Sequence, residues 1–190
     1  MLGYNLDMSF SSKIKVAVLR GGPSDEYDVS LKTGGHVLSI LRQMPDKYDP
    51  QDILISRDGE WHLSGLVDDP HKVLQHVDVV WNALHGQYGE DGQVQRVLEG
   101  LQIPFTGSGA VASALSMNKD MAKGLYKSYG LLTPEHELID DENLDEDKLI
   151  AIFQNYLHPV IVKPASSGSS VGMHLARSFS ELKEAVKEAF

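Results

Sequence analysis

The 190-residue chain contains no cysteine. Disulfide bonds and thiol chemistry are therefore excluded, and the composition fits a reducing compartment, so we expect a cytoplasmic protein. No apolar run approaches the roughly 18 residues of a membrane-spanning helix. The N-terminus lacks the basic-then-apolar order of a signal peptide, and we expect residues 1–12 to be a loose extension.

Positive charge is also scarce. The chain has 17 lysines and arginines against 27 acids, a formal net charge of −10. This balance argues against a general nucleic-acid binder, although a local basic pocket stays open. The hydrophobic content of 42% and charged content of 23% are ordinary for a globular protein.

Strand, turn and helix patterns alternate over residues 13–110, which predicts an α/β domain with a doubly wound parallel sheet. The expected elements are strand 13–19, helix 28–43, a strand and hairpin over 48–63 with an Asp58-Gly59 turn, strand 77–84, helix 94–101 and strand 103–105. Residues 66–75 read as a polar connector. Glu26, His85 and the Gly107–Gly109 turn would lie outside the carboxyl ends of the strands, where such sheets bind ligands.

Residues 111–190 form a second predicted domain, with helices followed by a hairpin. Helices are expected over 110–130 and 149–157, and a capping box at Ser178–Glu181 starts another. The acids of 140–147 are interpreted as a solvated helix start, and no metal site is assigned.

The hairpin in this domain has a lysine at its base. Val160–Val162 precedes Lys163 and Pro164, and a loop of serine and glycine leads to a second apolar run. Backbone N–H groups of such a loop, with the lysine charge, suit phosphate oxygens. A flexible hairpin with a solvated lysine fits the pattern equally well.

Four blocks then stand in a specific order: Gly21 to Ser30, Leu84 to Gly92, Thr106 to Lys119, and Val160 to Gly172. Together they resemble the N-terminal part of the D-alanine–D-alanine ligases of the ATP-grasp superfamily. The resemblance runs from about Lys13 to the end of the chain.

The resemblance implies an enzyme that joins two D-alanines with ATP and Mg²⁺, through an acylphosphate, for peptidoglycan precursors. Glu26 and Ser169 match catalytic residues, and Glu26, His85 and Ser169 match the substrate site. The matches to the ATP site are Lys119, Lys163, Gly168, Ser169, Ser170 and Val171. The implied partners are D-alanine, ATP and a second copy of the chain through its N-terminal domain, with no nucleic acid or membrane.

Each residue also has a structural interpretation. Lys119 suits a surface lysine in a first helical turn, and Glu26 suits the dipole of a helix start. His85 suits a structural histidine at a strand end, and Ser169 alone indicates nothing.

Some positions depart from the family pattern. Tyr27 stands where arginine is common, Gln87-Tyr88 replaces a smaller and often basic pair, and Ser166-Ser167 lacks an acid before the loop glycine. These differences leave D-lactate or D-serine open as second substrate.

Family members are usually longer, so the chain reads as a fragment, and the Mg²⁺ ligands and most of the adenine pocket are expected in the absent part. We therefore expect no ligase activity from these residues alone. A non-catalytic binding module or partner subunit is the alternative. A dinucleotide-dependent oxidoreductase is disfavoured, because Gly21-Gly22-Pro23 does not continue as G-x-G-x-x-G.

Overall fold

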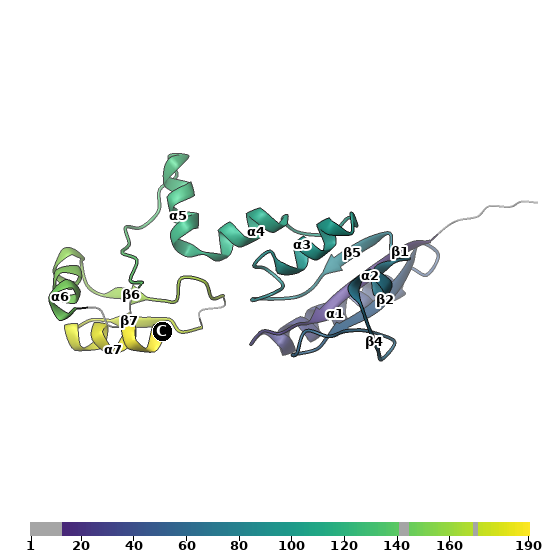
Figure 1. Ribbon diagram of the computed structural model, residues 1–190, viewed down its shortest axis with the longest axis horizontal. Coiled ribbons are helices and arrows are strands. Elements are labelled where there is room, and N and C mark those ends of the chain that lie inside the picture. The colour runs from purple at the N-terminus through teal and green to yellow at the C-terminus, as the bar shows by residue number, and fades with distance from the viewer. Residues whose placement is uncertain (1–12, 141–144, 169–170) are drawn as a thin grey trace, which may run out of the picture. The chain divides into compact units, whose positions relative to one another are not determined.

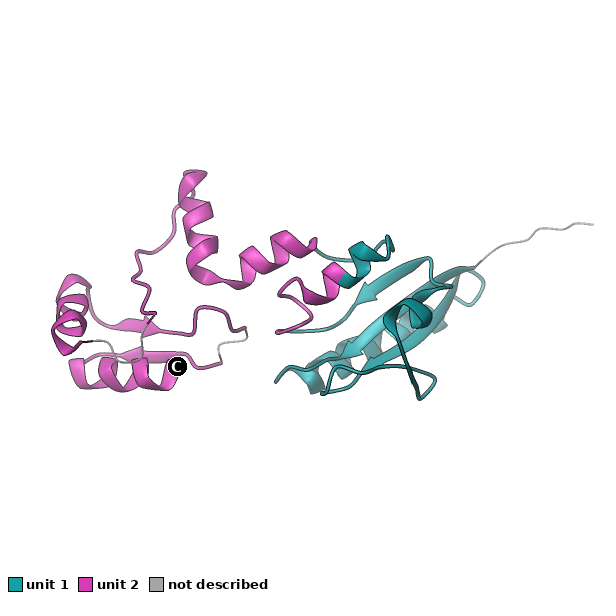
Figure 2. Ribbon diagram, in the orientation of Figure 1, with its two compact units in different colours: residues 1–85, 97–107 teal, residues 86–96, 108–190 magenta. Residues whose placement is uncertain are grey.

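The computed structural model describes residues 13–140, 145–168 and 171–190. Their contacts divide them into two units, one built from residues up to 85 and 97–107, the other from 86–96 and the residues from 108 onward (Figure 2). The expected N-terminal extension, residues 1–12, lies outside the described part. No helix among the described residues is both long and apolar enough to cross a membrane.

The helices and strands follow the expected α/β order through the first unit and become mainly helical after it (Figure 1). They are β1 (Ile14–Gly21), α1 (Tyr27–Arg42), β2 (Tyr48–Ile55), β3 (Trp61–Leu63), β4 (Leu66–Asp68), α2 (Pro70–Leu74), β5 (Val79–Asn82), α3 (Gln93–Gly100), α4 (Ala110–Met117), α5 (Lys119–Ser128), α6 (Glu146–Asn155), β6 (Val160–Val162), β7 (His174–Ala176) and α7 (Phe179–Ala189).

The first unit is built on a five-stranded sheet of order β4-β3-β2-β1-β5. The central strand β1 pairs in parallel with β2 and β5, while β3 and β4 add an antiparallel edge. The predicted α/β class is confirmed, with a mixed sheet. The parallel strands β1, β2 and β5 end at one edge of the sheet, which is where the loops that follow β1 and β5 begin.

The core of this unit forms because β1 is apolar on both faces. Val18 and Leu19 are completely buried, and Leu38 and Leu41 of α1 pack with Val18. Burying each such side chain contributes roughly 1.5–3 kcal/mol before the entropy of folding is counted.

A glycine and a buried serine shape the end of β1. Gly21 has φ +91°, and a Cβ there would lie 2.3 Å from the carbonyl oxygen of Ile55, so only glycine fits. The hydroxyl of Ser30 in α1 accepts from the Gly21 N–H and donates to the Ala83 carbonyl, both at 2.8 Å. This hydroxyl joins the last residue of β1 to the chain after β5.

The connector predicted over residues 66–75 is wrong. It contains strand β4 and helix α2. The Asp69 side chain accepts a hydrogen bond from the His71 N–H at 2.9 Å, and Pro70 occupies the first helical turn. The polar start of this segment therefore caps a helix whose apolar end, Val73 and Leu74, is buried in the core.

The strand predicted at residues 103–105 is reduced to one parallel bridge between Phe105 and Val80. Beyond this bridge, the Thr106 hydroxyl accepts a hydrogen bond from the Asn82 N–H at 3.0 Å, so a side chain takes the place of a backbone acceptor. The predicted strand 77–84 likewise shortens to β5.

The second unit contains the predicted hairpin, with β6 and β7 antiparallel. One face of this pair packs on the helices α6 and α7 through Leu149, Leu182 and Val186. On the other face Ile161 and Leu175 lie opposite each other and are exposed. The hairpin thus has one covered face and one open face.

Polar caps begin the helices of this unit. The predicted capping box at the start of α7 forms in part. Ser178 Oγ accepts a hydrogen bond from the Glu181 N–H, but the Glu181 carboxylate accepts from the N–H of Arg177 instead of that of Ser178. Asp145 caps α6 through the Asp147 N–H, as the helix-start interpretation requires. Residues 141–144 of the predicted acidic segment lie outside the described residues.

Candidate functional site

In the first unit, the loops after β1 and β5 are joined by Ser24. Its hydroxyl donates to the carbonyl oxygen of His85 at 2.8 Å and accepts from the N–H of Glu26 at 3.2 Å. The structure therefore brings together Glu26 and His85, which the sequence predicts at one sheet edge.

The His85 imidazole is half-buried against helix α1. Its Nε2 lies 3.0 Å from Oγ1 of Thr33, which is in the second turn of α1. Either the hydroxyl or the ring nitrogen donates, depending on the tautomer. The contact holds the ring at the sheet edge, an arrangement that suits both a substrate-site histidine and a structural one.

Glu26 is the residue that precedes the first turn of α1, with φ −90° and ψ 15°. Its carboxylate does not cap the helix, although the helix start is a favourable place for negative charge. A carboxylate at this edge can hold an ammonium group by a charge-assisted hydrogen bond.

Tyr27, one of the departures from the family pattern, is stacked by an arginine from the β2–β3 turn. The Arg57 guanidinium lies 4.3 Å from the ring centroid of Tyr27, and its nitrogen is 3.5 Å from the Asp28 carboxylate. Sequence reasoning missed Arg57. The only available signal was its place in the Asp58-Gly59 hairpin turn, whose reach to α1 depends on the tertiary fold.

In the second unit, Lys119 and Lys163 line one cavity of about 720 Å³. Lys119 begins α5 and Lys163 follows β6. The walls are largely apolar and include Ile152, Phe153 and Ile161. The two lysines predicted to contact phosphate are therefore brought together beside an apolar surface.

Lys119 is bound to the loop that follows Lys163. Its Nζ donates to the carbonyl oxygens of Pro164 at 2.9 Å and Ser167 at 2.5 Å, and its backbone N–H donates to Ala165. Burial, and then the neighbouring charge of Lys163, lower the pKa of Lys119. Lys119 is therefore partly buried and bound to the loop, and its role stays a prediction.

In the loop predicted to bind phosphate, the described residues before the gap form hydrogen bonds with Val171, the first described residue after it. The Val171 N–H donates to the Gly168 carbonyl at 3.1 Å, and Ser167 Oγ donates to the Val171 carbonyl at 3.2 Å. Ser169 and Ser170, the other predicted residues of this loop, lie outside the described residues.

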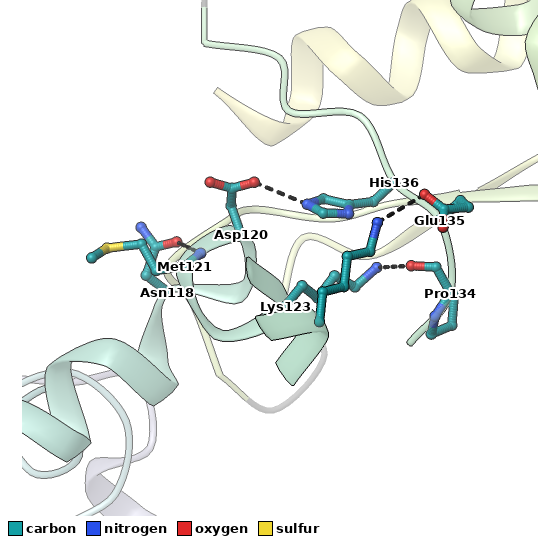
Figure 3. Close-up of polar contacts among 8 residues, drawn as sticks. Asn118, Asp120, Met121, Lys123, Pro134, Glu135 and His136 are labelled. Carbon is teal, nitrogen blue, oxygen red and sulfur yellow. Dashed lines mark hydrogen bonds and ion pairs between the residues drawn. The ribbon is translucent and has the colours of Figure 1, made fainter. Parts of the chain in front are cut away.

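Three contacts from α5 hold the segment of residues 134–136, and Figure 3 shows them. Lys123 Nζ donates to the Pro134 carbonyl at 3.0 Å, Lys127 pairs with Glu135 at 2.9 Å, and Asp120 pairs with His136 at 2.9 Å. Lys123, Asp120 and His136 also line the cavity, and sequence reasoning missed all three. The helical spacing of Lys119 and Lys123 was the one signal that could have found Lys123.

Comparisons with known proteins bear on this arrangement. The family model described as "D-ala D-ala ligase N-terminus" matches residues 64–108, and "D-ala D-ala ligase C-terminus" matches residues 125–190. The chain belongs to the D-alanine–D-alanine ligase family. A D-alanine–D-alanine ligase of Geobacter sulfurreducens is 40% identical over 177 residues, which is 93% of this chain and 51% of that relative. The chain thus spans about half the length of the curated relatives it matches.

Solved structures agree on the fold of this ligase-family chain. The D-alanine–D-alanine ligase from Coxiella burnetii superposes with a TM-score of 0.80 at 25% identity, over 94% of this chain and 60% of that one. The VanG D-Ala:D-Ser ligase from Enterococcus faecalis gives a TM-score of 0.77 at 30% identity, over the same shares. The predicted fold class and family are confirmed, whereas the roles of individual residues and the division at residue 110 stay predictions.

Proposed function

We propose that these residues form the first-substrate site and part of the nucleotide site of a D-alanine–D-alanine ligase, an ATP-dependent enzyme of peptidoglycan precursor synthesis. The observation that carries the proposal is the pairing of Lys119 and Lys163 in one cavity of a ligase-family chain. Two cations beside an apolar wall suit a ligand that joins a polyphosphate to an aromatic base.

The lysines and the apolar walls have separate roles. Lys119 and Lys163 would bind phosphate oxygens, assisted by the loop from Gly168 to Val171, and the exposed hairpin face at Ile161 would pack against the base. Bound ATP would supply the phosphoryl group that activates a carboxylate. The chain's own part is to neutralise and orient the phosphates.

The sheet edge of the first unit would hold the first D-alanine. Glu26 would accept hydrogen bonds from its ammonium, and His85, oriented by Thr33, would contact it from the neighbouring loop. Ser24 keeps these two loops together.

The described residues provide no group of three or more histidine, aspartate or glutamate side chains fit to hold a metal ion. We assign Mg²⁺ to contacts outside them. A homodimer through the N-terminal domain and a cytoplasmic location also stay predictions.

A fusion protein tests the function. Residues 1–190 would be joined to the C-terminal half of the Geobacter sulfurreducens ligase, and phosphate release would be measured with ATP and D-alanine. We expect turnover that needs both substrates, no turnover from residues 1–190 alone, and at least a roughly tenfold loss in Glu26→Gln or Lys163→Met, each of which removes a charge-assisted bond.

The matched control is Lys187→Met, an exposed lysine of α7 outside the cavity, which should keep full activity. A folded fusion that binds ATP but gives no turnover with any D-amino acid would favour the non-catalytic binding module.

A second candidate keeps the reaction but changes the second substrate. The 30% identity to a D-Ala:D-Ser ligase favours D-serine as the competitor to test. The same fusion supplied with D-alanine and D-serine together, with the products separated by mass, would distinguish the two.

A further inference from the structure

Three lysines, not two, line the cavity of the second unit. Lys119 and Lys123 are four residues apart in α5 and therefore share one face of the helix, and Lys163 comes from the end of β6. Lys123 differs in burial from the next lysine of the helix. It is half-buried, in contrast to Lys127 one turn later, which is exposed and does not line the cavity.

None of these three lysines forms an ion pair with a carboxylate in the part of the chain that the structure describes. Lys119 and Lys123 bind only carbonyl oxygens, those of Pro164 and Ser167 for the first and that of Pro134 for the second. A carbonyl is a neutral acceptor, so these bonds satisfy donors without cancelling charge.

Carboxylates do lie on the same two segments, but they have other partners. Asp120 is bound by His136, as Figure 3 shows, and Glu135 is bound by Lys127. Asp120 and Glu135 also line the cavity, but among the described residues neither forms an ion pair with Lys119, Lys123 or Lys163.

The lysines repel one another as a result. Burial and the charge of Lys163 lower the pKa of both Lys119 and Lys123, with Lys127 adding to the effect on Lys123 and Glu135 partly offsetting it. A cluster of like charges in a chain of net charge −10 is relieved by an anion with several charges of its own.

We propose that Lys123 is a third polyphosphate-binding lysine, which exchanges the Pro134 carbonyl for a phosphate oxygen of a nucleoside triphosphate. The inference rests on the proposed function, in which Lys119 and Lys163 bind the same phosphates. Lys123 adds a third cation along α5, so the lysines of the cavity can contact successive phosphates of the nucleoside triphosphate.

Calorimetric titration of the 190-residue protein with inorganic tripolyphosphate, and separately with ATP, tests the inference. We expect Lys123→Met to weaken binding of both ligands roughly tenfold, the loss of one charge-assisted bond, and Lys123→Arg to restore most of it. Lys187→Met, which removes the same charge outside the cavity, should change affinity less than about twofold.

A structural explanation is that Lys123→Met merely loosens the segment of residues 134–136 from α5. The double variant Lys127→Met with Glu135→Gln removes another contact between the same two segments and leaves the net charge unchanged. We expect it to bind tripolyphosphate normally. A loss equal to that of Lys123→Met would overturn the inference.

The outcomes separate this inference from the proposed function. If the unmodified protein binds neither ligand, the nucleotide site fails and the role of Lys123 fails with it. If Lys119→Met and Lys163→Met abolish binding while Lys123→Met has no effect, the nucleotide site stands and only the third lysine is wrong.

Discussion

The two units surround their candidate site residues with different interactions. In the first, the Ser24 hydroxyl joins the backbone of Glu26 to that of His85, and the Ser30 hydroxyl joins Gly21 to Ala83, so neighbouring polar groups satisfy one another. In the second, Lys119, Lys123 and Lys163 line a cavity, and within the described residues the amino groups of the first two donate only to carbonyl oxygens.

The difference teaches how each site relates to stability. In the first unit the residues that hold the loops also hold the fold, so changing them should lower the free energy of unfolding. In the second, Lys163 is exposed and repels Lys119 and Lys123, so changing Lys163 should impair anion binding at little cost to the fold.

The largest expected effect is that of Gly21→Ala in the first unit. The new Cβ would lie 2.3 Å from the Ile55 carbonyl in a backbone of positive φ, so we expect a loss of about 3 kcal/mol or more in the free energy of unfolding. Urea denaturation followed by the fluorescence of the buried Trp61 would measure it.

Gly59→Ala is the control for this prediction. Gly59 also has positive φ but nothing lies near its Cβ position, so only about 1 kcal/mol should be lost. Equal losses at the two positions would show that the close approach to Ile55 does not matter.

The next effect is that of Ser30→Ala. The buried N–H of Gly21 and carbonyl of Ala83 would lose their common partner, and we expect destabilisation of about 2 kcal/mol in the same assay. Ser39→Ala, an exposed serine of the same helix, should change stability by less than about 0.5 kcal/mol. If both substitutions have the same small effect, Ser30 does not join the two loops.

A smaller effect is expected for Arg57→Ala. This variant removes an exposed cation from the ring of Tyr27, which should cost about 0.5–1 kcal/mol. Arg57→Lys should recover part of the loss, because it keeps the charge but not the planar stack. Full stability in Arg57→Ala, measured by thermal unfolding, would mean that the contact adds nothing.

The smallest change in stability is expected for Lys163→Met in the second unit. Lys163 is exposed, and its loss should leave stability within about 0.5 kcal/mol of the unmodified protein, or slightly higher. Lys119 has a lowered pKa, so its protonated form is disfavoured in the fold; this penalty decreases as the pH rises above the folded pKa and disappears above the unfolded pKa.

Any gain in Lys163→Met should therefore be present near neutral pH and fade in alkaline solution. The pKa values of Lys119 and Lys123, followed by NMR of their side-chain carbons, should rise in this variant. Unchanged values, or a loss of more than about 1 kcal/mol, would remove the contrast between the two units.

Much of the fold could be predicted because its signals are local. The apolar run of β1, the Asp58-Gly59 turn and the Ser178 cap each act within a few residues, and each element formed. The prediction failed at residues 66–75, where polar residues were read as a connector although Asp69 and Pro70 begin a helix that buries Val73 and Leu74. Composition does not show which side of so short a helix faces the core.

The candidate site was predicted less completely. Glu26, His85, Lys119 and Lys163 could be selected as candidates because they stand in ordered glycine-rich blocks, and their roles stay predictions. Lys123 and Arg57 were missed because a lysine on a helix and an arginine in a turn are ordinary on any surface. Their importance comes from neighbours that are distant in sequence, at Pro134 and Lys163 for the lysine and at Tyr27 for the arginine.

The sequence by itself determined the alternation of strands and helices, the family, and the residue types available for chemistry, since these depend on periodicity, turn residues and the order of blocks. Only the tertiary structure decided the strand order, the bridge made by Ser24 and the gathering of three lysines in one cavity. These features depend on which distant segments pack together, and packing is set by the shape and burial of the whole unit rather than by any local pattern.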